Sequence, residues 1–159
     1  MAIYLKIDGL EGDVTESTHK NWVECDSMNW NVSRTLSTKT GQGKDRESTS
    51  PHISEITLTT KMDKTSPVFF SEACVGQGKT ALIHLVQTSP NGVETYMEYT
   101  LTNTLVSGYS VSADEDNRPQ ESITLNFTKI EMKYTPWNEA HRPEGSVPAG
   151  YDIALGIKL

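Results

Sequence analysis

The stretch from Ser54 to Lys79 constrains the fold more than any other part of this chain. Its first residues, Ile56 to Thr60, alternate apolar and polar side chains, and this period of two is typical of a half-buried β-strand. Ser66 and Pro67 follow as a helix entrance, because a Ser side chain can accept a bond from an orphan N–H and Pro presets the first helical φ. The sequence therefore predicts a strand and then a helix over residues 66–75.

The predicted helix has an apolar side and a marked end. Phe69, Phe70, Ala73 and Cys74 fall on one side of it at i, i+3 and i+4 spacing. Gly76 is expected to end the helix in the left-handed conformation. Since the rest of the chain has the sequence pattern of strands, we predict a β domain with a single side helix. This architecture indicates assembly rather than catalysis.

Composition excludes several classes of protein. The length of 159 residues suits one domain, 1–159, and the net charge of −7 argues against nucleic-acid binding, which needs a basic face. The opening segment lacks the pattern of a secretory signal, so no signal peptide is expected. No segment has the roughly 20 apolar residues that span a membrane. Cys25 and Cys74 are expected to be thiols, although a disulfide between them stays open.

Two segments differ from the strand pattern. Residues 37–52 contain no aliphatic or aromatic side chain, and such a long loop is usually functional or disordered, so we do not expect it to fold back onto the body. Residues 136–159 are expected to be an irregular tail, with a terminal edge strand at Tyr151, Ile153 and Leu155.

Three further patterns concern single strands. Met28, Trp30 and Val32 alternate with three polar residues, which predicts one strand with an apolar and an uncharged polar face. Strands are expected at Glu94–Thr102 and, separately, at Thr104–Ser112. The apolar phase flips between Phe127 and Ile130, as a β-bulge or a change of sheet would produce.

No motif predicts an active site, a cofactor site or a metal site. Gly76–Thr80 ends like a phosphate-binding loop, but it lacks the first glycine and follows a helix instead of opening one. His19, His52, His84 and His141 lack the spacing of metal ligands, although a site assembled in three dimensions stays open. His84 is expected to be a satisfied histidine in the middle of a strand. We predict that the chain is not an enzyme and needs no cofactor.

With these residues laid out, the chain resembles the haemolysin-coregulated protein family, the tube subunits of bacterial type VI secretion systems. The resemblance spans nearly the whole chain, and the order and spacing of its blocks carry it. The blocks are Ile3–Trp30, Ser54–Lys79, Tyr99–Ser107, Arg118–Tyr134 and the terminal Gly150–Ile153, where Tyr151 stands in place of the family's Trp.

The resemblance implies a subunit fold, a ring assembly and a way in which the tube leaves the cell. The fold is mainly β, a small closed or partly open antiparallel β-barrel of two packed sheets with one flanking α-helix at about 66–75. The subunits form hexameric rings that stack into a tube, which a contractile sheath and a spike expel from the bacterial cytoplasm without a signal peptide. Small effectors ride in the ring lumen. A phage-like tail tube protein and a monomeric ligand-binding β-barrel are the alternatives.

Two sets of residues are candidates for these contacts. Asn29, Asn31 and Ser33 share the polar strand face and are expected to line the lumen. The 37–52 loop buries no apolar area of its own, so a neighbouring subunit or ring is expected to order it. Its interface candidates are Gly41, Gly43, Lys44, Asp45, Arg46 and Glu47.

Overall fold

The computed structural model describes residues 1–38, 40–41 and 48–159. Within these residues the chain forms eleven β-strands and one α-helix, α1 (Ser66–Cys74). The strands are β1 (Ala2–Ile7), β2 (Val23–Asn29), β3 (Val32–Ser33), β4 (His52–Ile53), β5 (Ile56–Lys61), β6 (Lys79–Ser89), β7 (Gly92–Ser112), β8 (Gln120–Asn126), β9 (Lys129–Tyr134), β10 (Val147–Asp152) and β11 (Ile157–Lys158).

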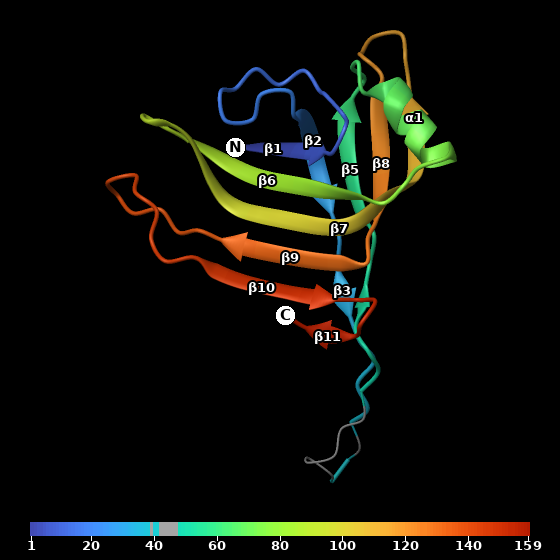
Figure 1. The fold of residues 1–159 in the computed structure, drawn as a ribbon, viewed down its shortest axis with the longest axis vertical. Helices are drawn as coiled ribbons and strands as arrows, with labels where there is room; N and C mark the ends of the chain where they lie inside the picture. The colour runs from blue at the N-terminus through green and yellow to red at the C-terminus, as the bar shows by residue number, and fades with distance from the viewer. Residues whose placement is uncertain (39, 42–47) are drawn as a thin grey trace.

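Six of the described strands close an antiparallel barrel in the order β7–β6–β1–β2–β5–β8, with β8 pairing back onto β7. β9, β10 and β11 extend the sheet outward from the first half of β7, and Figure 1 shows β6, β7, β9 and β10 side by side. This confirms the predicted β-barrel with one flanking helix. Alternate residues fill its interior: Leu5, Leu58, Ile83, Leu101 and Ile123 are fully buried.

The long strand β7 belongs both to the closed barrel and to the extension formed by β9, β10 and β11, because it bends. The prediction of two separate strands here is wrong: residues 92–112 are continuous. At the bend Asn103 has a φ of 53°, a left-handed conformation that Asn tolerates better than most residues. Gly78, which lies just before β6, leaves room for the Asn103 side chain, since a Cβ at that position would collide with it. Beyond the bend, β7 leaves β9 and pairs with β8.

The apolar phase flips after Phe127 because one strand ends and the next begins with different partners in the same sheet, where the sequence predicts a β-bulge or a change of sheet. β8 ends at Asn126 and lies between β5 and the second half of β7. β9 begins at Lys129 and lies between β10 and the first half of β7. The change happens where β7 bends, so one strand serves as the template for both segments.

Helix α1 packs against β7 at one end of the barrel (Figure 1). Phe69 is 1% exposed and Ala73 also packs on the core, but Phe70 is 60% exposed and Cys74 is exposed, so the predicted four-residue apolar face is wrong. Phe69 and Ala73, an i, i+4 pair, form the apolar contact of the helix with the core.

Both ends of α1 differ from prediction. Thr65, not Ser66, is the N-cap, while the Ser66 hydroxyl donates to buried Glu121 at 2.6 Å. Gly76 has no left-handed φ, and its lack of a side chain instead permits close contact with the Glu72 carbonyl. The helix ends through the Val75 N–H, which donates to the carbonyl oxygen of Ser71 at 2.9 Å.

The β2–β5 hairpin continues beyond the barrel. The predicted single strand through Met28–Ser33 is interrupted at Trp30 and Asn31, and a separate pair, β3 and β4, follows. Leu36 and Ser48 form one further bridge. Figure 1 shows the described part of this two-stranded stem projecting away from the body, as expected for this loop.

The C-terminal segment is more regular than predicted. Residues 147–152 form β10, which pairs with β9 along its whole length. Tyr151 lies in this strand, but Ile153 and Leu155 lie in the turn that follows, and Gly156 has a φ of 69°. The edge strand is Ile157–Lys158. The sequence of β10 includes Pro, Ala and Gly, so it lacks the alternation that marks a strand.

Candidate functional site

A row of polar side chains crosses the outer face of the barrel. Register places Tyr4 of β1 opposite His84 of β6, His84 opposite Glu98 of β7, and Glu98 opposite Lys133 of β9. Directly opposed residues project from the same face of a sheet. Ile83, which precedes His84, points into the core, so the row faces outward.

The loop between β1 and β2, residues 8–22, covers one end of this row. It places His19 and Trp22 over the sheet, and the two side chains are buried. The centroid of the His19 ring lies 4.8 Å from that of Tyr4 and 4.7 Å from that of Trp22, and Trp22 lies 4.6 Å from His84. Four aromatic rings therefore pack together and hold the loop against the barrel.

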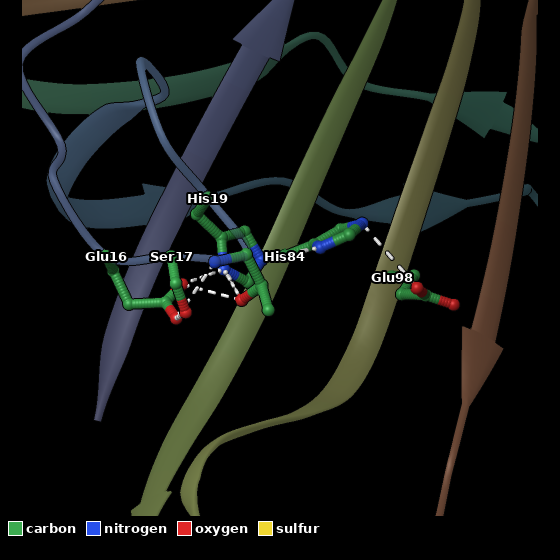
Figure 2. A network of polar contacts seen from close by, with 6 residues as sticks. Glu16, Ser17, His19, His84 and Glu98 are labelled. Atoms are coloured by element: carbon green, nitrogen blue, oxygen red, sulfur yellow. Dashed lines mark hydrogen bonds and ion pairs between the residues drawn. The ribbon is translucent and has the colours of Figure 1, made fainter.

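Polar contacts run through this cluster (Figure 2). Nδ1 of His19 lies 2.6 Å from Oε2 of Glu16, and Nε2 of His19 lies 3.0 Å from Nδ1 of His84. Nε2 of His84 lies 3.6 Å from Oε1 of Glu98, whose Oε2 pairs with Nζ of Lys133 at 2.8 Å. The contacts join the loop to three strands.

The pKa values of Glu16 and His84, at different points of this network, are both lowered, but for different reasons. Burial alone would raise the pKa of Glu16, but hydrogen bonds from Thr18 and His19 outweigh it and lower the pKa to about 2. Burial lowers the pKa of His84 to about 4, although Glu98 opposes this shift. Glu16 is therefore a carboxylate at neutral pH, and His84 resists becoming an imidazolium.

A hollow of about 580 Å³ lies beside the network on the same face. Its apolar side chains include Leu82, Met132 and Leu159, and its polar rim includes His84, Glu98 and Lys133. One side of the histidine pair is thus reached from the hollow, while His19 is shielded by the loop.

The described residues offer little for metal or thiol chemistry. They contain no group of three or more His, Cys, Asp or Glu that could hold a metal ion. Cys25 and Cys74 are free, and burial raises the pKa of the Cys25 thiol far above its usual range. Within the same residues, no helix has the length and apolar character needed to cross a membrane.

The three residues predicted to line a lumen are all exposed, but they do not share one strand. Asn29 ends β2, Ser33 lies in β3, and Asn31 lies between the two strands. The backbone N–H of Asn31 donates to Oγ of Ser54, and the Ser54 N–H donates back to the Asn31 carbonyl. This exchange keeps the hairpin paired across the interruption.

Of the six predicted interface residues, the structure describes only Gly41. Gly41 has a φ of 83°, and its surroundings are open. The other five lie outside the described residues: Gly43, Lys44, Asp45, Arg46 and Glu47.

Sequence reasoning missed the contact between His19 and His84. The two residues are 65 positions apart, and no spacing rule connects them. The signal that exists is weak: His84 is a polar residue between two apolar ones in a strand, and Trp22 lies three positions after His19.

Comparison with known proteins decides the family. A model of the family described as "Type VI secretion system effector, Hcp" matches residues 4–134. The chain belongs to the Hcp family. It is therefore a type VI secretion system Hcp protein, with the β-barrel fold of the tube proteins.

Individual Hcp relatives agree over almost the whole chain. Protein hcp1 of Pseudomonas aeruginosa is 26% identical over 98% of this chain and 97% of its own length. A solved structure of Hcp1 from Salmonella typhimurium superposes with a TM-score of 0.79 at 25% identity, covering 99% of this chain and 98% of that one. A structure of a type six secretion system protein has a TM-score of 0.92 at 23% identity, with 99% of both chains covered.

Proposed function

We propose that this Hcp protein is a structural, non-enzymatic subunit of the type VI secretion tube. Six copies form a closed ring, rings stack into a tube, and sheath and spike proteins drive the tube from the cytoplasm out of the cell. Small effectors travel in the lumen. Family membership supports this proposal.

The observation that carries the assembly is the apolar surface at one end of the described fold. Val32 and Leu36 on the stem are 56% and 43% exposed, and Val147, Ile157 and Leu159 at the C-terminal strands are 64%, 49% and 49% exposed. Stem and terminal strands lie close together, since Val32, Ile53 and Tyr151 line one small apolar pocket. The edge strand β11 also has unpaired backbone groups on one side. Neighbouring subunits would cover both features.

Native mass spectrometry tests the ring directly. We expect a dominant species of six times the 17.6 kDa chain mass, formed without nucleotide or metal. Subunits joined by a heterologous interface and related by rotation form a closed ring. The measured mass should therefore equal that of one ring or a whole multiple of it. Monomer alone at micromolar concentration would instead favour a single ligand-binding barrel.

A further inference from the structure

The outer surface of the barrel has a second face, on strands other than those that carry His84 and Glu98. It is formed by β2, β5, β8 and the second half of β7. Leu58 and Ile123 on these strands are fully buried, so the residues on either side of them face outward. Register aligns one row of outward hydroxyl side chains across the four strands: Ser27, Thr59, Ser122 and Ser110.

A second row runs beside the first and has the same character. A Cβ at Gly108, which ends this row, would lie 3.3 Å from Oγ1 of Thr124, so the glycine leaves that hydroxyl open on one side. The second row consists of Asn29, Thr57, Thr124 and Gly108. Both rows are made of short, uncharged residues, and together they are called the hydroxyl face below.

Charged side chains border the hydroxyl face at its two ends. Lys61 and Asp26 line a hollow beyond one end. Glu55 lies at the other end, where its two carboxylate oxygens accept hydrogen bonds from Oγ of Ser107 at 2.8 Å and Nδ2 of Asn126 at 3.2 Å. The rows between these ends therefore form an uncharged band.

Such a band can form hydrogen bonds without selecting the charge of a partner. A hydroxyl group both donates and accepts, and short side chains lose little rotamer freedom when they are held. Oγ of Ser27 and Oγ1 of Thr59 already lie 2.5 Å apart. Charged side chains repeated around a channel would instead concentrate an electrostatic field and select a partner by its charge. The row through Glu98 and Lys133 carries such charges.

We propose that the hydroxyl face is the lumen wall of the ring and contacts small effector proteins of either net charge through hydrogen bonds. This inference rests on the proposed function and specifies its cargo surface. Asn29 belongs both to the hydroxyl face and to the lumen candidates, so the wall extends from Asn29 across three further strands. The charged row through Glu98 then faces away from the lumen.

Distances between spin labels test which face lines the lumen. Nitroxide labels at Ser27→Cys or Ser110→Cys mark the hydroxyl face, and a label at Glu131→Cys marks the charged face. A Cys74→Ser background removes the exposed native thiol, and Cys25 is buried. In a ring closed by rotation, distances between equivalent labels grow with their distance from the ring axis. Double electron–electron resonance should therefore give shorter distances between subunits for Ser27→Cys and Ser110→Cys than for Glu131→Cys.

The other outcomes of the labelling experiment overturn the proposal in distinguishable ways. Longer distances for Ser27→Cys and Ser110→Cys would place the hydroxyl face on the outside of the ring, where a sheath would meet it. Loss of the ring in these two variants alone, seen by native mass spectrometry, would place the face between subunits. No distance between subunits in any labelled chain would mean that there is no ring, which contradicts the proposed function as well.

A charge placed on each face tests how the cargo is contacted. Two small effectors, one acidic and one basic, are each co-expressed with the ring, and both should be retained by the parent. In Ser110→Asp we expect loss of the acidic effector and retention of the basic one. Thr100→Asp is the matched control, because it adds the same charge to the face that carries Glu131, and it should leave both effectors bound. Equal retention in Ser110→Asp and the parent, or loss in Thr100→Asp alone, contradicts the assignment.

Discussion

The two phenylalanines of α1 show how a single residue's environment depends on its direction around the helix. Phe69 is 1% exposed and fills space above the sheet, whereas its neighbour Phe70 is 60% exposed. Consecutive helical residues point about 100° apart, so only one of the two can reach a sheet that lies on one side. The helix is held to the barrel chiefly through Phe69 and Ala73.

Truncating each phenylalanine separates these environments. We expect Phe69→Ala to destabilise the subunit by about 3–5 kcal/mol, because it leaves a cavity in the core. Phe70→Ala is the matched control and should change stability by no more than about 0.5 kcal/mol, as for other surface substitutions. Denaturant unfolding of both variants measures the difference. Equal losses in the two would mean that the helix docks by another face.

At the scale of elements, the bend in β7 organises the whole sheet. Its first half pairs with β6 and β9, and its second half pairs with β8, which closes the barrel. The bend requires space for the Asn103 side chain, and Gly78 provides it.

A substitution at the bend should strain the barrel. We expect Gly78→Ala to cost about 1–3 kcal/mol, the usual range for overpacking. Adding Asn103→Gly should recover part of the loss, because it removes the colliding group and tolerates the positive φ. Gly145→Ala is the control, since a Cβ there meets nothing within 4 Å. Thermal melting of the parent, both single variants, the double variant and the control measures these losses. If the loss in the double variant equals the sum of the losses in Gly78→Ala and Asn103→Gly, the collision is refuted.

At the scale of the whole molecule, a closed barrel carries two extensions that expose apolar side chains near each other. These are the stem built on β3 and β4 and the terminal strands β10 and β11. The three exposed polar residues Asn29, Asn31 and Ser33 lie where the stem leaves the barrel. We propose that they line the lumen of the ring, where uncharged polar groups would contact the cargo.

Cargo retention tests that placement. An Asn31→Arg or Ser33→Arg ring should assemble and melt within about 0.5 kcal/mol of the parent, since exposed positions tolerate substitution. It should nevertheless fail to retain a co-expressed small effector, because a long charged side chain narrows the lumen. Asn31→Ser is the control and should retain it. Unchanged retention in an intact Arg ring places this face elsewhere, and loss of the ring places it at a subunit interface.

The sequence by itself determined the classes of element and their order, because hydrophobic periodicity is a local property. The strand at Ile56–Lys61, the helix that begins at Ser66 and the break in apolar phase after Phe127 all follow from neighbouring residues. The block order also indicated the family that the comparisons confirm. Asn29, Asn31 and Ser33 are exposed, and their place in a lumen stays a prediction.

Tertiary structure decided which side chains of each element are covered and which strands and loops meet. Periodicity groups Phe69 with Phe70, but the position of the sheet decides that only Phe69 is covered. β10 exists because β9 offers a free edge, and backbone hydrogen bonds to that edge do not require alternating side chains. The pairing of His19 with His84 depends on the register of β1 against β6 and on how the loop folds over both strands. Such contacts join residues far apart in the chain, and only the closed barrel brings them together.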